Sequence, residues 1–595
     1  MFSGVAATGA SPSISKDGLN WANAREFWSF QAPVRRSPPE TRISGWARQP
    51  IDHFILAQME AESLQPAAEA TRRTLLRRAT FGLTGLPPSP EEIQDFINDP
   101  DSNAYEKVVD RLLSSPRFGE RMASLWLTVA RYAEDQAHQV GNRTEHFYPN
   151  AHLYRAWVID AFNRDLPYDD FIRLQLAADA IEGGGSPNQS ALGFIGLGHK
   201  YYSRSRLEVM ADEWEDRVDT VSRGLLGLTV ACARCHEHKY DPISMSDYHA
   251  LAGVFASTDM FNKPLNEDAY AKEKDKSKKP MLAMHVVKDG KVQDLPIFLR
   301  GDVEQKGDVV KRGFLEVLGE HGRREFKDGS GRRELAEAIV DPGNPLTARV
   351  MVNRVWDHVF GQPLVATPSN FGALGEQPTH PRLLDDLAVR FMDGGWSIKS
   401  LVREMALSAT YRQASENPKA AREADPENRH YSRIARRRLE VEQYRDALLF
   451  VSGRLSQEGG RSLELNDPKN LRRTVYGRIS RKELNSLMMQ FDYPDANVHA
   501  ADRASTTTPM QKLWMMNNPF VIERARQLAA KLNAPARSIE ANVRRAYVSM
   551  YGRPATDDEV GLGKAFLQEK DDGEVDRWTQ YAQILMAANE FLYVD

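Results

Sequence analysis

The chain of 595 residues contains only two cysteines, Cys232 and Cys235, and both belong to one pentapeptide, CARCH. So few thiols exclude a disulfide-rich secreted scaffold. They also exclude four-cysteine zinc sites and an all-cysteine iron–sulfur cluster held within one chain. Stability must therefore come from a hydrophobic core, for which hydrophobic residues, 41% of the chain, supply ample material.

The spacing of this pentapeptide is C-x-x-C-H, the attachment signature of c-type haem. Two thiols three residues apart on one helical turn can reach the two vinyl groups of a single haem and form thioethers. His236 follows directly, beside the porphyrin face, where it can supply the proximal imidazole. The motif therefore predicts one covalent haem c held by Cys232 and Cys235, with His236 as an iron ligand.

Three other sites can be built from the same residues. A redox-active dithiol is one, although no βαβ pattern surrounds the motif. A zinc site is the second, with ligands from Cys232, Cys235, His236 or His238, and Asp241. A simple disulfide is the third. Visible absorption separates these from haem, because only haem absorbs near roughly 400 nm.

A pure electron-transfer haem needs a sixth iron ligand, and Met and His both serve. The candidates are Met245, His249 and Met260, close to the motif in sequence, and His199, His358 and His380, which are distant but can fold back. An open sixth position would instead allow oxygen or peroxide chemistry.

Net charge and hydropathy limit the classes of protein to which the chain can belong. Lys and Arg number 78 against 82 Asp and Glu, a net charge of -4, which argues against nucleic-acid binding through a broad basic face. No run approaches 18 apolar residues, so no transmembrane segment is expected. The first residues, MFSGVAATGASPSIS, lack the pattern of a signal peptide. The cysteine motif nevertheless favours a periplasmic or otherwise exported protein whose signal peptide precedes this numbering.

Helical periodicity dominates the chain, and the fold class is predicted to be mainly α. We expect two helical domains joined by a linker with a small β-hairpin. The expected boundaries are an extended arm over 1–48 that lies on the first domain, a helical domain over 49–260 with the C-x-x-C-H motif, a linker over 261–330, and a helical domain over 331–595. The hairpin is predicted where LAMHVV and VQDLPIFL flank KDGK.

Two helix starts carry capping-box signals: Ser89 with Glu92, and Thr556 with Glu559. A further helix runs up to the cysteine motif with Trp214 on its apolar face. Its other face is acidic, in the stretch DEWED (212–216), and is expected to be solvated, with an ion or partner site as the alternative.

At CARCHEHKYDPISMSDYHALAGVFAST (232–258), and in other long strings over nearly the whole chain, the sequence resembles the planctomycete-type cytochrome c family. Residues 50–258 are similar to the family's first conserved domain of unknown function, with landmarks such as LTGLPPSPEE and GLTVACARCHEHKYDPI. Residues from about 330 to 595 are similar to the second, with landmarks such as NFGALGEQPTHPRLLDDLA and TTTP. The resemblance implies an exported protein that carries haem c.

Only three residue roles follow from the resemblance, those of Cys232, Cys235 and His236. Many family members have an additional cytochrome domain with its own C-x-x-C-H motif, which this sequence lacks, so at most one haem is implied. His358 and His380 fall within landmarks of the second domain, which favours them over other histidines as distal ligands.

Three functions compete. The first is an exported mono-haem protein that acts in electron transfer or redox chemistry with an unknown partner protein. The second is an extracytoplasmic enzyme, such as a haem-dependent oxidoreductase or an enzyme acting on polysaccharide, because 595 residues far exceed what an electron carrier requires. It predicts a cleft beside the motif with ionisable residues around it. The third is a binding protein stabilised by zinc or a disulfide.

Overall fold

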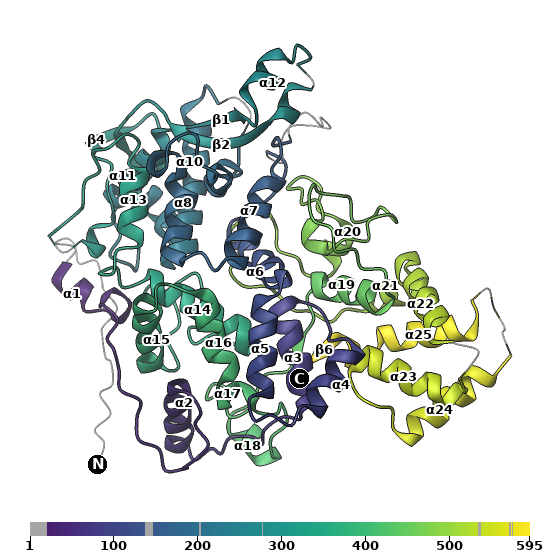
Figure 1. Ribbon diagram of the computed structural model, residues 1–595. Helices are drawn as coiled ribbons and strands as arrows, with labels where there is room; N and C mark the ends of the chain where they lie inside the picture. The colour runs from purple at the N-terminus through teal and green to yellow at the C-terminus, as the bar shows by residue number, and fades with distance from the viewer. Residues whose placement is uncertain are drawn as a thin grey trace.

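The computed structural model describes residues 21–136, 147–201, 204–276, 278–319, 321–533, 537–570, 573 and 575–595. It is mainly α-helical, with about 52% helix in 26 α-helices over these ranges, and its sheets are small antiparallel pairs of strands (Figure 1). The predicted fold class is thus confirmed. In the same ranges no helix has the length and apolar character needed to cross a membrane.

Up to residue 260, in what we call the N-terminal part, the structure is built from helices. They are α1 (Trp21–Arg25), α2 (Pro50–Ala61), α3 (Arg72–Thr84), α4 (Pro90–Asn98), α5 (Ala104–Ser114), α6 (Pro116–Val129), α7 (His152–Asn163), α8 (Tyr168–Ile181), α9 (Gly193–Gly196), α10 (Leu207–Val221) and α11 (Met245–Ala256).

A middle segment carries four strands and one short helix: β1 (Thr258–Pro264), α12 (Glu267–Lys272), β2 (Ala283–Asp289), β3 (Leu295–Phe298) and β4 (Lys306–Val310). The C-terminal part, from residue 331, returns to helices. They are α13 (Arg332–Ile339), α14 (Thr347–Phe360), α15 (Pro381–Asp393), α16 (Ile398–Leu407), α17 (Ala409–Arg412), α18 (Lys419–Ala424), α19 (Val441–Val451), α20 (Ser486–Gln490), α21 (Pro509–Asn517), α22 (Pro519–Leu532), α23 (Ile539–Tyr551), α24 (Asp557–Gln568), α25 (Arg577–Ala587) and α26 (Asn589–Leu592), with β5 (Arg437–Arg438) pairing to β6 (Tyr593–Val594).

Both predicted capping boxes are present. The Glu92 amide donates to Ser89 Oγ (3.2 Å) and the Ser89 amide donates to Glu92 Oε2 (2.8 Å), which starts α4. The Thr556 and Glu559 pair starts α24 with the same two distances. These local signals were sufficient because each satisfies backbone N–H groups that the first helical turn leaves without partners.

The predicted hairpin is wrong in its pairing. Both of its strands exist, but β2 pairs with β1 along seven residues and β3 pairs with β4. The KDGK turn does not bring β3 back to β2 because the Gly290 amide donates to Ser257 O (2.8 Å) at the end of α11. The segment expected to be a linker, 261–330, therefore includes the second half of β1 and all of α12.

The end of the N-terminal arm lies on the first domain, as expected, because the Arg42 and Ile43 amides donate to Glu60 Oε1 of α2 (2.8 Å each). The earlier described part of the arm packs on the C-terminal part, which was not expected. The Trp28 ring lies 5.6 Å from the Phe371 ring. Arg349 Nη1 donates to Gln31 O (2.6 Å), and the Arg36 amide donates to Asp386 Oδ1 (3.1 Å). Trp28 thus packs between Arg349 of α14 and Phe371 of the loop that follows α14.

The N-terminal, middle and C-terminal parts share one contiguous core of buried apolar side chains. Helix α13 packs on α8, and α16 packs on α5. Arg332 of α13 is 1% exposed and donates to both oxygens of Asp179 of α8 (2.8 and 2.7 Å) and to Asp289 at the end of β2 (2.7 Å). These contacts join all three parts, and the domain boundaries stay a prediction from sequence.

We predict that Ser89→Ala destabilises the start of α4 by about 1 kcal/mol, because the Glu92 amide loses its acceptor. Hydrogen exchange read by mass spectrometry should show roughly fivefold faster exchange in the first turn of α4. Ser37→Ala, at an exposed position of the arm, is the control and should change nothing there. Equal exchange in both variants would contradict the capping assignment.

Candidate functional site

The cysteine turn follows a break in α10. The helix passes into one π-helical turn, η4 (Ser222–Leu226), and stops at Gly227, whose φ of 62° is left-handed. The chain then forms a 3₁₀ turn, η5 (Val230–Arg234), with Cys235 as its C-cap. Residues three apart eclipse in a 3₁₀ turn, so Cys232 and Cys235 point to one side. Both are free and exposed.

Arg234, between the two cysteines, fixes the turn to α10. Its guanidinium forms ion pairs with Asp212 (2.8 Å) and with Glu215 of that helix. These ion pairs involve two of the four acidic residues in the stretch 212–216. The other two acids are buried in ion pairs: Glu213, fully buried, with Arg204, and Asp216, through both oxygens, with Arg131 (2.7 Å each). The expectation of a solvated acidic face is therefore confirmed for Asp212 and Glu215, whose side chains are 53% and 36% exposed. It is wrong for Glu213 and Asp216, which are buried against arginines.

His236 is exposed, and its ring is oriented by the backbone. Its Nδ1 lies 2.7 Å from the carbonyl oxygen of Glu237. A carbonyl only accepts, so Nδ1 carries a proton, and in the neutral ring Nε2 is then the nitrogen with the lone pair that can bind a metal. Metal-binding histidines are commonly held in this way, with one ring nitrogen donating to a backbone carbonyl.

His238 and Asp241 form a buried pair directly after the motif. The Asp241 amide donates to His238 Nδ1 (2.8 Å), so His238 Nε2 carries the proton and faces Thr229 Oγ1 at 3.0 Å. Burial lowers the pKa of His238 and raises the pKa of Asp241. Both side chains hold the turn closed, and neither points to the exposed thiols.

A loop of the C-terminal part supports the turn. The Ala373 amide donates to Asp241 Oδ1 (2.6 Å), and the Phe371 amide donates to Gly227 O (2.7 Å). A Cβ atom on Gly372 would lie 2.4 Å from the Asp241 carboxylate, so only glycine fits there. The cysteine motif thus depends on residues about 130 positions away in sequence.

A loop of the middle segment touches Cys235. A Cβ atom at Gly301, in the turn η7 (Leu299–Gly301), would lie 2.4 Å from Cys235 Sγ, and Gly301 has a left-handed φ of 77°. Glycine is required for both reasons. Exposed apolar side chains stand on the loops around the turn: Tyr240 (37% exposed), Leu299 (44%) and Leu374 (61%).

The structure separates the candidate distal ligands near the motif. Met245 lies beside the turn, half-buried, and its amide donates to Glu237 Oε2 (3.0 Å). Met260 is on β1, and its sulfur accepts from Arg217 Nη2 (2.9 Å). His249 has both ring nitrogens engaged, with Met245 O (2.8 Å) and with the Phe298 amide (3.0 Å).

The distant histidines are buried among other side chains and do not come to the exposed turn. His358 of α14 lines a cavity to which no residue of the motif contributes. His380 caps α15 and packs on the Tyr431 ring at 5.5 Å, and burial lowers its pKa to about 3. His199 is also buried, with Nδ1 3.0 Å from the Tyr201 hydroxyl.

The zinc alternative finds no ready ligand cluster. Within the described ranges, no group of three or more His, Cys, Asp or Glu side chains is arranged to hold a metal ion. Two side chains of the predicted set, His238 and Asp241, are engaged in the contacts above.

Sequence reasoning singled out the cysteines and His236, whose haem-binding role stays a prediction, and it missed the residues that support them. Thr229, Gly301 and Gly372 carry no signal in sequence, because each acts through a neighbour far along the chain. Fold and site together define a mainly α protein that presents a C-x-x-C-H turn, held between its N-terminal and C-terminal parts.

Comparison with known families agrees with this division. Residues 50–260 match the family PSCyt2, described as a protein of unknown function (DUF1549). Residues 331–567 match the family PSD1, described as a protein of unknown function (DUF1553). The chain therefore contains one domain from each of these two families. Searches of curated proteins and of solved structures returned no match to the chain.

We predict that Gly372→Ala loosens the support of the cysteine turn, since the added methyl group displaces the Asp241 carboxylate. Overpacking of this kind costs about 1–3 kcal/mol. Amide exchange at Ala373 should become roughly 5- to 150-fold faster. Gly185→Ala, where a Cβ atom meets open space, is the matched control. Equal protection of Ala373 in both variants would show that the contact does not hold the turn.

Proposed function

We propose that the chain is an exported protein that carries one covalent haem c at Cys232, Cys235 and His236 and acts in electron transfer or redox chemistry. The observation that carries the proposal is the geometry of the turn. Two exposed thiols share one side of a 3₁₀ turn, and the free Nε2 of His236 follows directly. The resemblance to planctomycete-type cytochromes c and the matches to both domain families support it.

The residues present fit a haem group in three respects. The sulfurs are accessible, with Gly301 beside Cys235 instead of a bulkier residue. His236 has the tautomer of an iron ligand, set by the carbonyl of Glu237. Tyr240, Leu299 and Leu374 provide apolar surface next to the turn. When bound, haem would supply one-electron redox chemistry at iron.

The chain's own residues would hold and orient the group. Cys232 and Cys235 would form the thioethers, and Arg234, anchored on α10, would keep the two sulfurs in register. Among the candidate distal ligands we retain Met245, which lies beside the turn and whose sulfur accepts no hydrogen bond from the part of the chain that the structure describes. It assigns no iron-binding role to His358 or His380. Attachment of haem c takes place outside the cytoplasm, which is why export belongs to the proposal.

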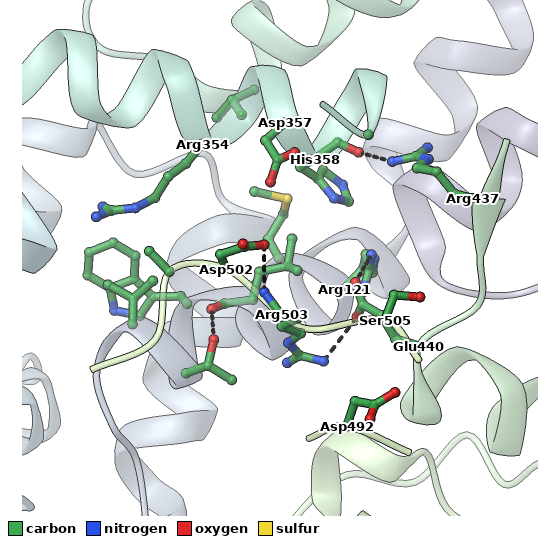
Figure 2. A pocket seen from close by; sticks show the side chains of 18 of the residues that line it. Arg121, Arg354, Asp357, His358, Arg437, Glu440, Asp492, Asp502, Arg503 and Ser505 are labelled. Atoms are coloured by element: carbon green, nitrogen blue, oxygen red, sulfur yellow. Dashed lines mark hydrogen bonds and ion pairs between the residues drawn. The ribbon is translucent and has the colours of Figure 1, made fainter. Parts of the chain in front are cut away.

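A second function is favoured by a separate observation. A cavity of about 350 Å³ opens between α6, α14 and β5, away from the motif, and carboxyl groups face it (Figure 2). This volume is within the range of ligand sites, roughly 300–1,000 Å³. We propose that the cavity serves enzymatic action on an extracytoplasmic substrate such as polysaccharide. It does not lie beside the cysteine motif, where a cleft was expected.

The haem assignment predicts a mass increase of one haem and a Soret band near roughly 400 nm in protein purified from a host that attaches haem c. Cys232→Ala with Cys235→Ala should abolish both, because no thioether can form. His236→Ala should keep the covalent mass and change the spectrum. His321→Ala, also at an exposed histidine, is the control and should change neither.

Wild-type protein without the mass increase and without colour would contradict the assignment. Zinc found by metal analysis in that protein would support the alternative of a zinc-stabilised binding protein.

A further inference from the structure

The cavity lies where helices of the N-terminal and C-terminal parts meet. One wall is apolar and is formed by Met122, Leu125 and Val129 of α6 with Met351 and Val355 of α14. Charged side chains from α14, from residues 436–440 and from segment 501–505 form the remainder. Figure 2 shows Asp357 and Asp502 projecting into this space from α14 and from segment 501–505.

Asp357 is a carboxyl group without a partner. Among the described residues, its carboxylate has no hydrogen bond and no ion pair within 4.0 Å, although it is largely buried. Burial, with the charges of Asp502 and Glu440, raises the pKa of Asp357 to about 7, and Arg437 offsets this only in part. A buried carboxyl group without a partner is costly unless it stays protonated or acts on a ligand.

Glu440, on the same cavity, is in the opposite situation. Arg121 donates to both of its oxygens (2.7 and 3.1 Å), and Arg503 adds a third contact (3.1 Å). Burial opposes ionisation, but these guanidinium groups hold the pKa of Glu440 well below its usual range. Two neighbouring carboxyl groups whose environments shift their pKa values in opposite directions are typical of acid–base sites. Because arginines hold both oxygens of the Glu440 carboxylate, Glu440 contributes a fixed negative charge to the cavity. It does not transfer a proton.

Asp502 is suited to the part of a base. Its side chain is exposed at the cavity, and Oδ1 accepts only the amide of Arg503 (2.7 Å). No arginine or lysine among the described residues forms an ion pair with it. Its carboxylate is therefore open to water on the side that Asp357 faces.

We propose that the cavity is an active site for hydrolysis of a glycosidic bond, with Asp357 as general acid and Asp502 as general base. This inference rests on the second proposed function and is independent of the haem. Asp357 transfers its proton to the glycosidic oxygen as the bond from that oxygen to the anomeric carbon breaks. Water forms the new bond to the anomeric carbon and gives a proton to Asp502. The products are a free sugar, as its hemiacetal, and the alcohol that carried the glycosidic oxygen, and proton exchange with solvent restores both carboxyl groups.

The residues that line the cavity favour hydrolysis of a glycosidic bond over hydrolysis of an ester or amide bond. Acyl transfer usually needs a nucleophile beside a base. The described lining contains no cysteine or lysine, and the Thr128 hydroxyl donates to Leu125 O (2.9 Å). Ser505 also lines the cavity, but among the described residues its hydroxyl has no hydrogen bond to His358 or to a carboxylate that could act as its base. A sugar ring matches what is present, since its hydroxyls both donate and accept and its faces are apolar. The small volume suits a terminal sugar unit of a chain.

The test uses the whole chain with haem attached and a panel of 4-nitrophenyl glycosides of neutral and acidic sugars. We expect hydrolysis of at least one, lost above about pH 7 as Asp357 gives up its proton. Asp357→Asn should lower kcat about 10²- to 10⁴-fold. With the 2,4-dinitrophenyl glycoside of the same sugar, whose leaving group needs no proton, the loss should be under about tenfold.

Asp502→Asn should lower kcat for both leaving groups, because the base acts on water, and it tests the cavity if Asp357→Asn fails to fold. Asp308→Asn, exposed on β4, is the matched control and should retain full activity. Equal losses with both leaving groups in Asp357→Asn, or no loss, would overturn the assignment of the acid and leave the second function standing. No hydrolysis of any glycoside by the wild-type chain would overturn both. Neither outcome bears on the haem.

Discussion

The cysteine turn depends on one buried carboxylate. Asp241 is 1% exposed, and it accepts the Ala373 amide while its own amide fixes the ring of His238. Through these bonds a short irregular segment, which has little secondary structure of its own, is held against the C-terminal part. Removal of one partner of a buried hydrogen bond leaves the other unsatisfied, at a cost of about 1–3 kcal/mol. The turn and the loop at Gly372 are therefore expected to keep or lose their order together.

One side chain, that of His499, lies between the cysteine turn and the cavity. His499 connects the region of the cysteine turn to that of the cavity, because it donates from Nδ1 to Val129 O (2.8 Å) and accepts from the Ser369 hydroxyl (2.7 Å). Val129 lines the cavity, and Ser369 begins the loop that supports the turn. Each site takes residues from both matched families. This gives a physical reason for the presence of both domains in one chain: neither site is complete with one domain.

Sequence patterns predicted what depends on neighbours in the chain. Ser89 and Glu92 lie three residues apart and cap α4 as expected, and the C-x-x-C-H spacing places both cysteines on one side of a turn. Patterns failed where partners are distant. β2 is a good strand in sequence, yet its partner is the polar β1, because the end of α11 holds Gly290. In sequence, Asp357 is an ordinary acid on an amphipathic helix, and its pKa is raised by burial in the folded chain and by the approach of Asp502 and Glu440. Such placement is set by tertiary packing, which periodicity does not encode.

The most direct measurement is tryptic peptide mapping, under reducing conditions, of protein from a host that attaches haem c. Cleavage after Arg234 separates Cys232, in peptide 224–234, from Cys235, in peptide 235–239. The account predicts that the two peptides stay joined by one haem, because thioethers survive reduction. Two separate, unmodified peptides would contradict it, since a disulfide opens on reduction and a zinc site leaves no covalent bond.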